Sequence, residues 1–332
     1  MKTLVVVPTF DEAASILHTL DEISLYVPDA HVLVVDDASP DGTGRIVAAR
    51  AETDPRISVL HRGARGGLGP AYRAGFARAL DLGYDVVVEM DADGSHPAER
   101  LPAVLAALGG ADLSIGSRWV REGRTDGWAL HRRILSWGAS AYVRRMLGSR
   151  TRDTTSGFRA FRAETLRRID VGTTTSSGYG FQIETLHRVE RCGLRVAEVP
   201  IVFAEREHGR SKMTLGIILE AYLRVAHWRR HPYDPARTLG AGSVGEHREV
   251  EGQPRAAERR FAGRHGATGD GRDVVHDRES QSAATRVAAA PVVETHETFE
   301  DARAFLRRNS GAVVVHVEDA TAVDGAHGER NA

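Results

Sequence analysis

The amino-acid sequence predicts an α/β fold in which a mostly parallel β-sheet is flanked by helices. In residues 1–90, short runs rich in valine alternate with segments whose apolar residues recur at helical spacing. The valine-rich runs are nearly continuous in apolar residues, which is typical of parallel strands that are covered on both faces. The resulting β-α-β-α order favours a sheet sandwiched between layers of helices.

The predicted elements follow one another along the chain. Strands are predicted at residues 4–7, 32–35, 57–60 and 86–90. Between the first two strands, helical spacing is found for Ile16, Leu17, Leu20 and Ile23. Further helices are predicted at residues 45–51, 71–82 and 129–147. An αβ segment continues to Phe203, and a long amphipathic helix is predicted at 214–230.

The patterns divide the chain into one folded domain and a C-terminal extension. All the strong patterns lie in residues 1–235. Residues 236–290 are rich in Gly, Ala, Arg and Glu and contain hardly any large apolar residue, so we expect a disordered linker. Residues 291–332 form a small αβ segment, with a helix expected at 298–308 and a strand at 312–317. The sequence assigns no role to this segment.

The composition restricts the class of function. The formal net charge is −1, so the chain as a whole does not attract nucleic acid, and we expect no nucleic-acid partner. The sole cysteine, Cys192, excludes an internal disulfide and fits a reducing compartment. No stretch reaches the roughly 18 apolar residues that span a bilayer. The N-terminal apolar run meets Pro8 and then acids, as expected of a buried strand and not of a signal peptide.

Acidic clusters follow several of the predicted strands. They are the segment PTFDE at 8–12, the pair Asp36-Asp37, the segment Asp91-Ala92-Asp93, and Asp153 with its neighbouring threonines. Open α/β sheets bind ligands at the carboxyl ends of their strands. The chemistry is therefore expected at these positions.

Asp91 and Asp93 are the strongest candidates for a metal site. Two carboxylates at i and i+2 beyond a strand can converge on one hard cation, and Mg²⁺ takes one or two carboxylates together with waters and substrate phosphates. A departing nucleotide diphosphate needs such a cation. The alternative is a loop turned by aspartate and Gly94 without a ligand.

The glycines at 66, 67 and 69 follow a predicted strand and precede a helix. This arrangement is compatible with a phosphate cradle. Tyr72 stands where the dinucleotide fingerprint has its third glycine, and no Walker lysine follows. A plain tight turn therefore explains the segment equally well.

Taken together, the motifs resemble family 2 glycosyltransferases of the GT-A fold, and more narrowly the dolichol-phosphate (polyprenol-phosphate) mannose synthases. The resemblance covers about residues 1–230. It depends on the segments VVVPTFDEAASI, VVDDASPDGT, GLGPAY, EMDADGSHP, GSRW, RRILS, TSGFRAF, GYGFQIE, EVPIVF and REHGRSKM.

The resemblance implies a role for each matching residue. The donor nucleotide-sugar is bound by Pro8, Phe10, Glu12, Asp37, Ala92, Arg206 and Lys212. Of these, the first four hold the nucleoside, and the two basic residues close over the diphosphate. Mg²⁺ or Mn²⁺ is held by Asp91 and Asp93, with Ser95 at the third ligand position. The acceptor phosphate is received by Arg118, Arg132 and Ser136.

The implied reaction transfers a mannosyl residue from a nucleotide-sugar, GDP-mannose, to a polyprenyl monophosphate with inversion. The enzyme is expected to be peripheral on the cytoplasmic face of the membrane, and a separate membrane-protein partner is left open. The chain departs from the family pattern at Phe10 and Asp11, where members often read PTYNE. It also departs at Ser95, where many members carry glutamine.

The chemistry of the residues agrees with a phosphate acceptor. A lipid monophosphate is already largely dianionic at neutral pH and needs no strong base, whereas it does need cations, and arginine forks suit phosphate. Asp153 is either a base or a loop residue.

Other functions are alternatives to mannosyl transfer to a lipid phosphate. The enzyme could transfer another sugar, use a glycan hydroxyl as the acceptor, or be a sugar-1-phosphate nucleotidyltransferase. A non-catalytic alternative is a nucleic-acid patch at residues 128–145. The nucleotidyltransferase would need a Gly-rich basic loop where PTFDEAAS stands.

The helix at 214–230 is predicted to be the membrane contact. It places Leu215, Ile218, Leu219 and Tyr222 along one stripe, and Trp228, Arg229 and Arg230 follow at its end. A core helix or a dimer seam is the alternative interpretation of the same stripe.

Overall fold

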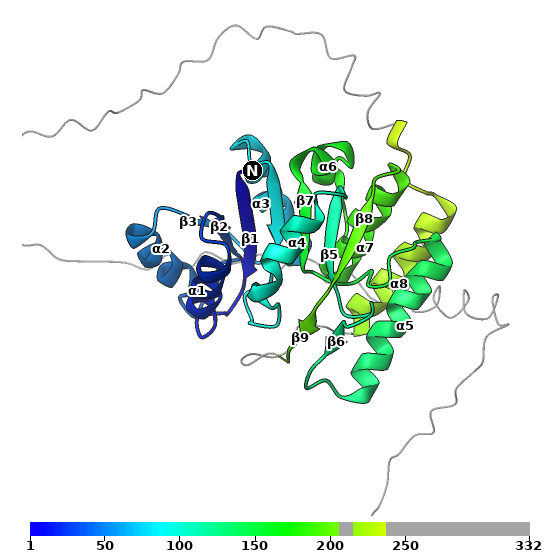
Figure 1. Ribbon diagram of the computed structural model, residues 1–332, viewed down its shortest axis with the longest axis horizontal. Helices are drawn as coiled ribbons and strands as arrows, with labels where there is room; N and C mark the ends of the chain where they lie inside the picture. Colours follow the sequence, from blue (N-terminus) through cyan, green and yellow to red (C-terminus); the bar gives the residue numbers. More distant parts are fainter. Residues whose placement is uncertain (206–214, 237–332) are drawn as a thin grey trace, which may run out of the picture. The chain divides into compact units, whose positions relative to one another are not determined.

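The computed structural model describes residues 1–205 and 215–236, and of residues 215–218 it describes the helical backbone only. Arg206, Lys212 and the predicted segments at 237–332 therefore lie outside the described residues. The described residues form a seven-stranded sheet with helices on both faces, and a second sheet of two short strands (Figure 1). The predicted fold class is confirmed.

The first half of the domain alternates strands and helices as the valine-rich runs predicted. Its elements are β1 (Thr3–Thr9), α1 (Ile16–Tyr26), β2 (His31–Asp36), α2 (Thr43–Thr53), β3 (Ile57–His61), α3 (Leu68–Asp81) and β4 (Val86–Glu89). The four strands are all parallel and lie in the order β3-β2-β1-β4. Their carboxyl ends therefore meet at one edge of the sheet.

The second half extends the sheet in the order β7-β5-β8. Its elements are a 3-10 turn (Ala98–Arg100), α4 (Leu101–Ala107), β5 (Leu113–Ser117), β6 (Arg124–Thr125), α5 (Leu130–Leu147), β7 (Arg159–Arg162), α6 (Ala163–Arg168), a 3-10 turn (Val171–Thr173), α7 (Gly178–Arg191), β8 (Val196–Pro200), β9 (Val202–Phe203) and α8 (Leu215–Arg230). β7 runs antiparallel to both β4 and β5, so the sheet is mixed at this point.

Two apolar layers cover the two faces of the sheet, and alternate residues of β1 contribute to each. One layer contains Val5 and Val7 and packs against α1, α2 and α4. The other contains Leu4 and Val6 and packs against α3, α6 and α7. Burial of both faces explains why the strands are nearly continuous in apolar residues.

A third apolar cluster joins α5, α7 and α8 through Val143, Ile183 and Val225. Trp228 packs against this cluster, and its ring stacks on His187 at a centroid distance of 6.2 Å. Trp228 is half-buried in this contact, which supports the alternative of a core helix, and the prediction that Trp228 reaches a headgroup layer stays a prediction. Leu219 remains 44% exposed.

None of the described helices is both long enough and apolar enough to span a membrane.

Candidate functional site

Two loops at the carboxyl edge of the sheet hold each other in place. The loop after β1 donates three backbone N–H groups to side chains of the loop after β2. The bonds run from Asp11 to Ser39 Oγ at 3.2 Å, from Glu12 to Thr43 Oγ1 at 3.0 Å, and from Ala13 to Asp41 Oδ2 at 2.9 Å. This pairing explains why the segments PTFDEA and VVDDASPDGT contain so many short polar residues.

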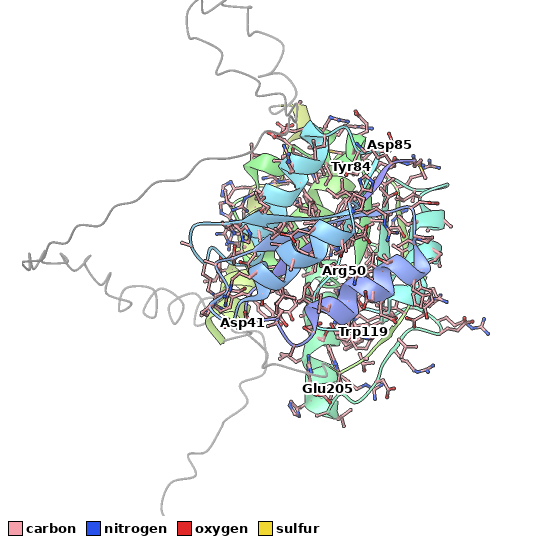
Figure 2. All side chains as sticks on the ribbon, turned by 90° about the vertical axis from the view of Figure 1, so that its left-hand side faces the viewer. Asp41, Arg50, Tyr84, Asp85, Trp119 and Glu205 are labelled. Atoms are coloured by element: carbon pink, nitrogen blue, oxygen red, sulfur yellow. The ribbon has the colours of Figure 1, made fainter. Side chains whose placement is uncertain are left out.

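Asp41, which follows β2, and Trp119, which follows β5, lie at one end of the domain (Figure 2). Tyr84 and Asp85, which precede β4, lie at the other end (Figure 2). The carboxyl ends of the parallel strands thus share the end of the molecule where the acidic clusters gather.

A cavity of about 360 Å³ opens at this end. Its volume is in the range of small-molecule sites. It is lined by Pro8, Thr9, Phe10, Glu12, Asp37, Arg65, Gly66, Gly67, Leu68, Ala71, Asp91, Ala92, Asp93, Thr155, Gly157, Ser177, Gly178, Tyr179 and Gln182. The structure therefore brings together seven of the predicted residues, namely Pro8, Phe10, Glu12, Asp37, Asp91, Ala92 and Asp93.

Asp91 is held from two sides. The Tyr72 hydroxyl donates to its Oδ1 at 3.4 Å. Its backbone N–H donates to His96 Nδ1 at 3.0 Å, which requires that nitrogen to be unprotonated. His96 Nε2 lies 3.9 Å from Asp91 Oδ2. The side chain of Asp91 is 28% exposed, so this carboxylate is both oriented and accessible from the cavity.

Ser95 supports Asp93. Its backbone N–H and its hydroxyl both donate to Asp93 Oδ1, at 3.1 and 2.5 Å, and Ser95 itself is 1% exposed. Ser95 is not among the residues that line the cavity. Direct coordination of a metal by Ser95 stays a prediction. What the hydrogen bonds show is that Ser95 orients the carboxylate of Asp93.

The two aspartates suit a cation that is shared with a phosphate-bearing ligand. Within residues 1–205 and 215–236, no group of three or more His, Cys, Asp or Glu side chains could hold a metal by itself. Asp91 and Asp93 supply hard oxygen donors at the cavity wall. Mg²⁺ and similar ions accept one or two carboxylates and take their other ligands from water and phosphate, so the donor set fits.

Burial keeps Glu89, which lies near Asp91, from carrying a negative charge. Glu89, at the end of β4, is fully buried, and this burial raises its pKa to about 8, although Arg159 opposes the shift. Glu89 is therefore protonated at neutral pH. Glu89 therefore adds no negative charge next to Asp91 at neutral pH.

Asp37 is bound by the glycine segment. The backbone N–H groups of Gly66 and Gly67 donate to its Oδ2 at 2.9 and 2.8 Å, and Arg62 pairs with its Oδ1. These two amides are therefore occupied by a carboxylate of the protein itself. Of the two interpretations of this segment, the structure favours a tight turn that shapes the cavity over a phosphate cradle.

The residues predicted for the acceptor do not line the cavity. Arg118 and Arg132 flank the same indole, that of Trp128, with guanidinium-to-centroid distances of 5.6 and 3.8 Å. Ser136 lies one turn after Arg132 on α5. Arg132 Nη1 also lies 3.7 Å from Glu205 Oε1. The three residues are thus neighbours, and their acceptor role stays a prediction.

Asp153 is committed to Arg118. It is fully buried, and its two carboxylate oxygens accept bonds of 2.7 Å from Arg118 Nε and Nη2. Both carboxylate oxygens of Asp153 are therefore engaged by the guanidinium of Arg118. This arrangement supports the loop role, and the role of Asp153 as a base stays a prediction.

Several cavity residues escaped the sequence analysis. Arg65 lies over the Phe10 ring at 4.1 Å, and Ser177, Gly178, Tyr179 and Gln182 come from the start of α7. The start of α7 reaches the cavity because Gly69 lets the chain pass closely, since a Cβ there would lie 2.4 Å from the Ser176 carbonyl oxygen. The sequence signal for Gly178, Tyr179 and Gln182 was the segment GYGFQIE, to which no role was assigned.

Comparison with known proteins agrees with these features. Residues 4–170 match the model of the family described as glycosyl transferase family 2. The chain is 51% identical over 228 residues to the undecaprenyl-phosphate mannosyltransferase of Micrococcus luteus, which covers 69% of this chain and 94% of that protein. It is 47% identical over 229 residues to the polyprenol monophosphomannose synthase of Mycolicibacterium smegmatis, which covers 68% of this chain and 86% of that protein.

Among solved structures, the chain is similar to glucosyl-3-phosphoglycerate synthase from Mycobacterium tuberculosis, in a crystal structure with Mn²⁺, uridine-diphosphate-glucose and phosphoglyceric acid. The TM-score is 0.51 at 24% identity, over 70% of this chain and 81% of that chain. This likeness concerns the fold alone.

Proposed function

Because the chain belongs to glycosyl transferase family 2, we propose that it transfers a mannosyl residue from GDP-mannose to a polyprenyl monophosphate with inversion. The observation that carries this proposal is the cavity in which Asp91 and Asp93 face Pro8, Phe10 and Glu12. The named relatives from M. luteus and M. smegmatis support the sugar and the lipid acceptor.

The donor occupies the cavity. Pro8, Phe10, Glu12 and Asp37 hold the nucleoside, and Asp91 and Asp93 hold Mg²⁺ or Mn²⁺ at the diphosphate. A cation held there would supply positive charge against the departing nucleoside diphosphate. Tyr72 and Ser95 keep the two carboxylates oriented. Arg206 and Lys212, which lie outside the described residues, belong to the same proposed donor site.

The acceptor phosphate approaches beside Trp128, where Arg132 and Ser136 position it and Arg118, whose charge is balanced by Asp153, completes the site. One phosphate oxygen attacks the anomeric carbon while the bond from that carbon to the diphosphate oxygen breaks, so the configuration inverts. The attacking phosphate carries the negative charge already, and no side chain has to remove a proton. The commitment of Asp153 to Arg118 is compatible with a reaction that needs no base.

A lipid acceptor brings the enzyme to a membrane surface. We therefore expect peripheral association with the cytoplasmic face, with a separate membrane protein as a further partner to be sought.

The proposed activity is tested directly. The full chain should be incubated with GDP-mannose, GDP-glucose, UDP-glucose and undecaprenyl phosphate in detergent, with Mg²⁺, Mn²⁺ or EDTA, and the lipids analysed by mass spectrometry.

The expected product is undecaprenyl-phosphate-mannose, formed from GDP-mannose and lost with EDTA. Asp81→Asn, an exposed aspartate at the end of α3, is the matched control for Asp93→Asn. Product from a UDP-sugar alone would replace the proposed donor, and absence of any lipid product would overturn the proposal.

A further inference from the structure

The helix α5 exposes an unusual amount of apolar surface. Four of its large apolar side chains face solvent, with exposed fractions of 67% for Leu130, 59% for Ile134, 45% for Leu135 and 57% for Trp137. Leu130, Ile134 and Trp137 follow one another at i, i+4 and i+7 and therefore share one face of the helix. The opposite side is occupied, because Val143 is buried against α7 and α8.

The same helix is strongly basic. It contains Arg132, Arg133, Arg144 and Arg145 and no acidic residue, although the chain as a whole has a net charge of −1. Arg133, Arg144 and Arg145 are exposed. A helix with an apolar stripe and exposed arginines is typical of segments that lie in the interface of a membrane.

A second cavity continues the stripe along the helix. It has a volume of about 280 Å³ and is lined by Trp119, Trp137, Ala141, Arg144 and Arg152. Ala141 and Arg144 extend the spacing that begins at Leu130 and passes through Trp137. Tryptophan prefers the headgroup level of a bilayer, and arginine binds phosphate groups, so the lining residues suit phospholipid headgroups.

We propose that this face of α5, defined by Leu130, Ile134, Trp137, Arg133 and Arg144, lies on a bilayer that contains anionic lipid. This surface adds a membrane contact to the proposed function. It rests on that function, because the proposed acceptor is a lipid located in the membrane. It differs from the membrane contact predicted from sequence, which was the helix at 214–230. Arg132 and Ser136 lie on the same helix, so the bilayer contact and the proposed acceptor residues belong to one element.

The apolar residues favour a bilayer over nucleic acid as the partner. Exposed leucine and isoleucine side chains gain free energy when a hydrocarbon layer covers them, whereas phosphate backbones offer no such contact. Arginines near an anionic surface add attraction that weakens with salt. The two contributions together predict reversible binding that depends on both lipid charge and ionic strength.

The test is flotation of the full chain with vesicles of phosphatidylcholine alone or with phosphatidylglycerol, at low and high salt. Wild type should float with the anionic vesicles. Ile134→Glu/Trp137→Glu and, separately, Arg133→Glu/Arg144→Glu should lower the bound fraction at least about tenfold, because each removes an apolar or a charged contribution.

Matched controls carry the same changes elsewhere. Leu25→Glu/Leu82→Glu replaces exposed leucines near the ends of α1 and α3, and Arg78→Glu/Arg167→Glu replaces exposed arginines of α3 and α6. Both controls should float like wild type. Circular dichroism and thermal unfolding of every variant ensure that a loss of binding is not a loss of fold.

Transfer to a short-chain polyprenyl phosphate in detergent separates the two proposals. The Ile134→Glu/Trp137→Glu variant should keep this activity while it loses vesicle binding. If wild type floats but makes no lipid product, the proposed function fails and the surface stands. Folded α5 variants that float like wild type, or a wild type that binds only nucleic acid, would overturn the surface.

Discussion

Arg118 and Asp153 form a buried ion pair in which three hydrogen bonds link the two residues. Arg118 is 5% exposed and Asp153 is fully buried. Besides the two guanidinium bonds, the backbone N–H of Arg118 donates to Asp153 Oδ2 at 2.9 Å. The pair ties the end of β5 to the segment before β7, which are neighbours in the sheet.

Removal of one partner should destabilise the domain strongly. Asp153→Ala leaves the buried guanidinium without its counter-ion, and we expect the free energy of unfolding to fall by roughly 3–5 kcal/mol. Urea denaturation measures this change. The double variant Arg118→Met/Asp153→Ala should lose much less than the sum of the single variants, and additive losses would show that the pair is not coupled.

Substitution of the paired aspartates should abolish transfer without unfolding the protein. Asp91→Asn and Asp93→Asn each weaken the binding of the cation that would stabilise the departing diphosphate, so we expect the rate to fall ~10²–10³-fold. Initial rates with and without EDTA measure the effect, and Asp81→Asn serves as the control. Activity that survives both the substitutions and EDTA would contradict a metal at this pair.

The acceptor assignment predicts a change in one Michaelis constant and not in the other. Arg132→Gln and Ser136→Ala should raise the KM for lipid phosphate about 10–100-fold, as expected when a hydrogen bond to a charged group is lost, and leave the KM for the nucleotide-sugar nearly unchanged. Arg150→Gln, an exposed arginine after α5, is the control. Equal effects on both constants would assign these residues to the donor. Arg118 is unsuitable for this test because its removal also leaves Asp153 unpaired.

His187 should make the domain sensitive to acid. Burial, together with the nearby positive charge of Arg191, lowers the pKa of His187 to about 4. The unfolded chain binds a proton near pH 6.5, so between pH 6.5 and 4 the unfolded state holds more protons than the folded state. Stability is full above pH 6.5 and decreases as the pH falls, by up to about 3 kcal/mol.

His187→Gln removes this titration, so the difference between its unfolding free energy at pH 7 and at pH 4.5 should be smaller than in wild type. His18→Gln, at an exposed position of α1, is the control. If wild type and His187→Gln lose stability in parallel on acidification, His187 does not cause the sensitivity.

Residues beyond 235 should be dispensable for catalysis. Tyr233 must be kept, because its ring lies 4.7 Å from the Arg188 guanidinium and its carbonyl oxygen accepts a bond from Arg191 Nε. A chain that ends after Pro235 is expected to transfer sugar in detergent at a rate close to that of the full chain. A truncated protein that folds, by circular dichroism, but makes no product would contradict this domain boundary.

The sequence alone determined the alternation of strands and helices and the position of the paired aspartates. These features depend on spacing within a few residues. Strand β4 is a run of three valines that ends at Glu89. Asp91 and Asp93 come directly after this strand, so locating the strand also locates the two aspartates. Local periodicity reports such features because a strand buried on both faces and the loop after it are encoded by neighbouring residues.

Only the tertiary structure decided which polar groups that are distant in sequence form hydrogen bonds or ion pairs with one another. Asp37 meets amides that lie 29 and 30 residues further along the chain, and Arg118 meets Asp153 at a separation of 35 residues. Trp228 packs against the cluster that joins α5, α7 and α8, and β7 pairs antiparallel with β4. A buried charge must find a partner, but spacing along the chain does not state which one, because that choice depends on how the whole sheet brings its strand ends together.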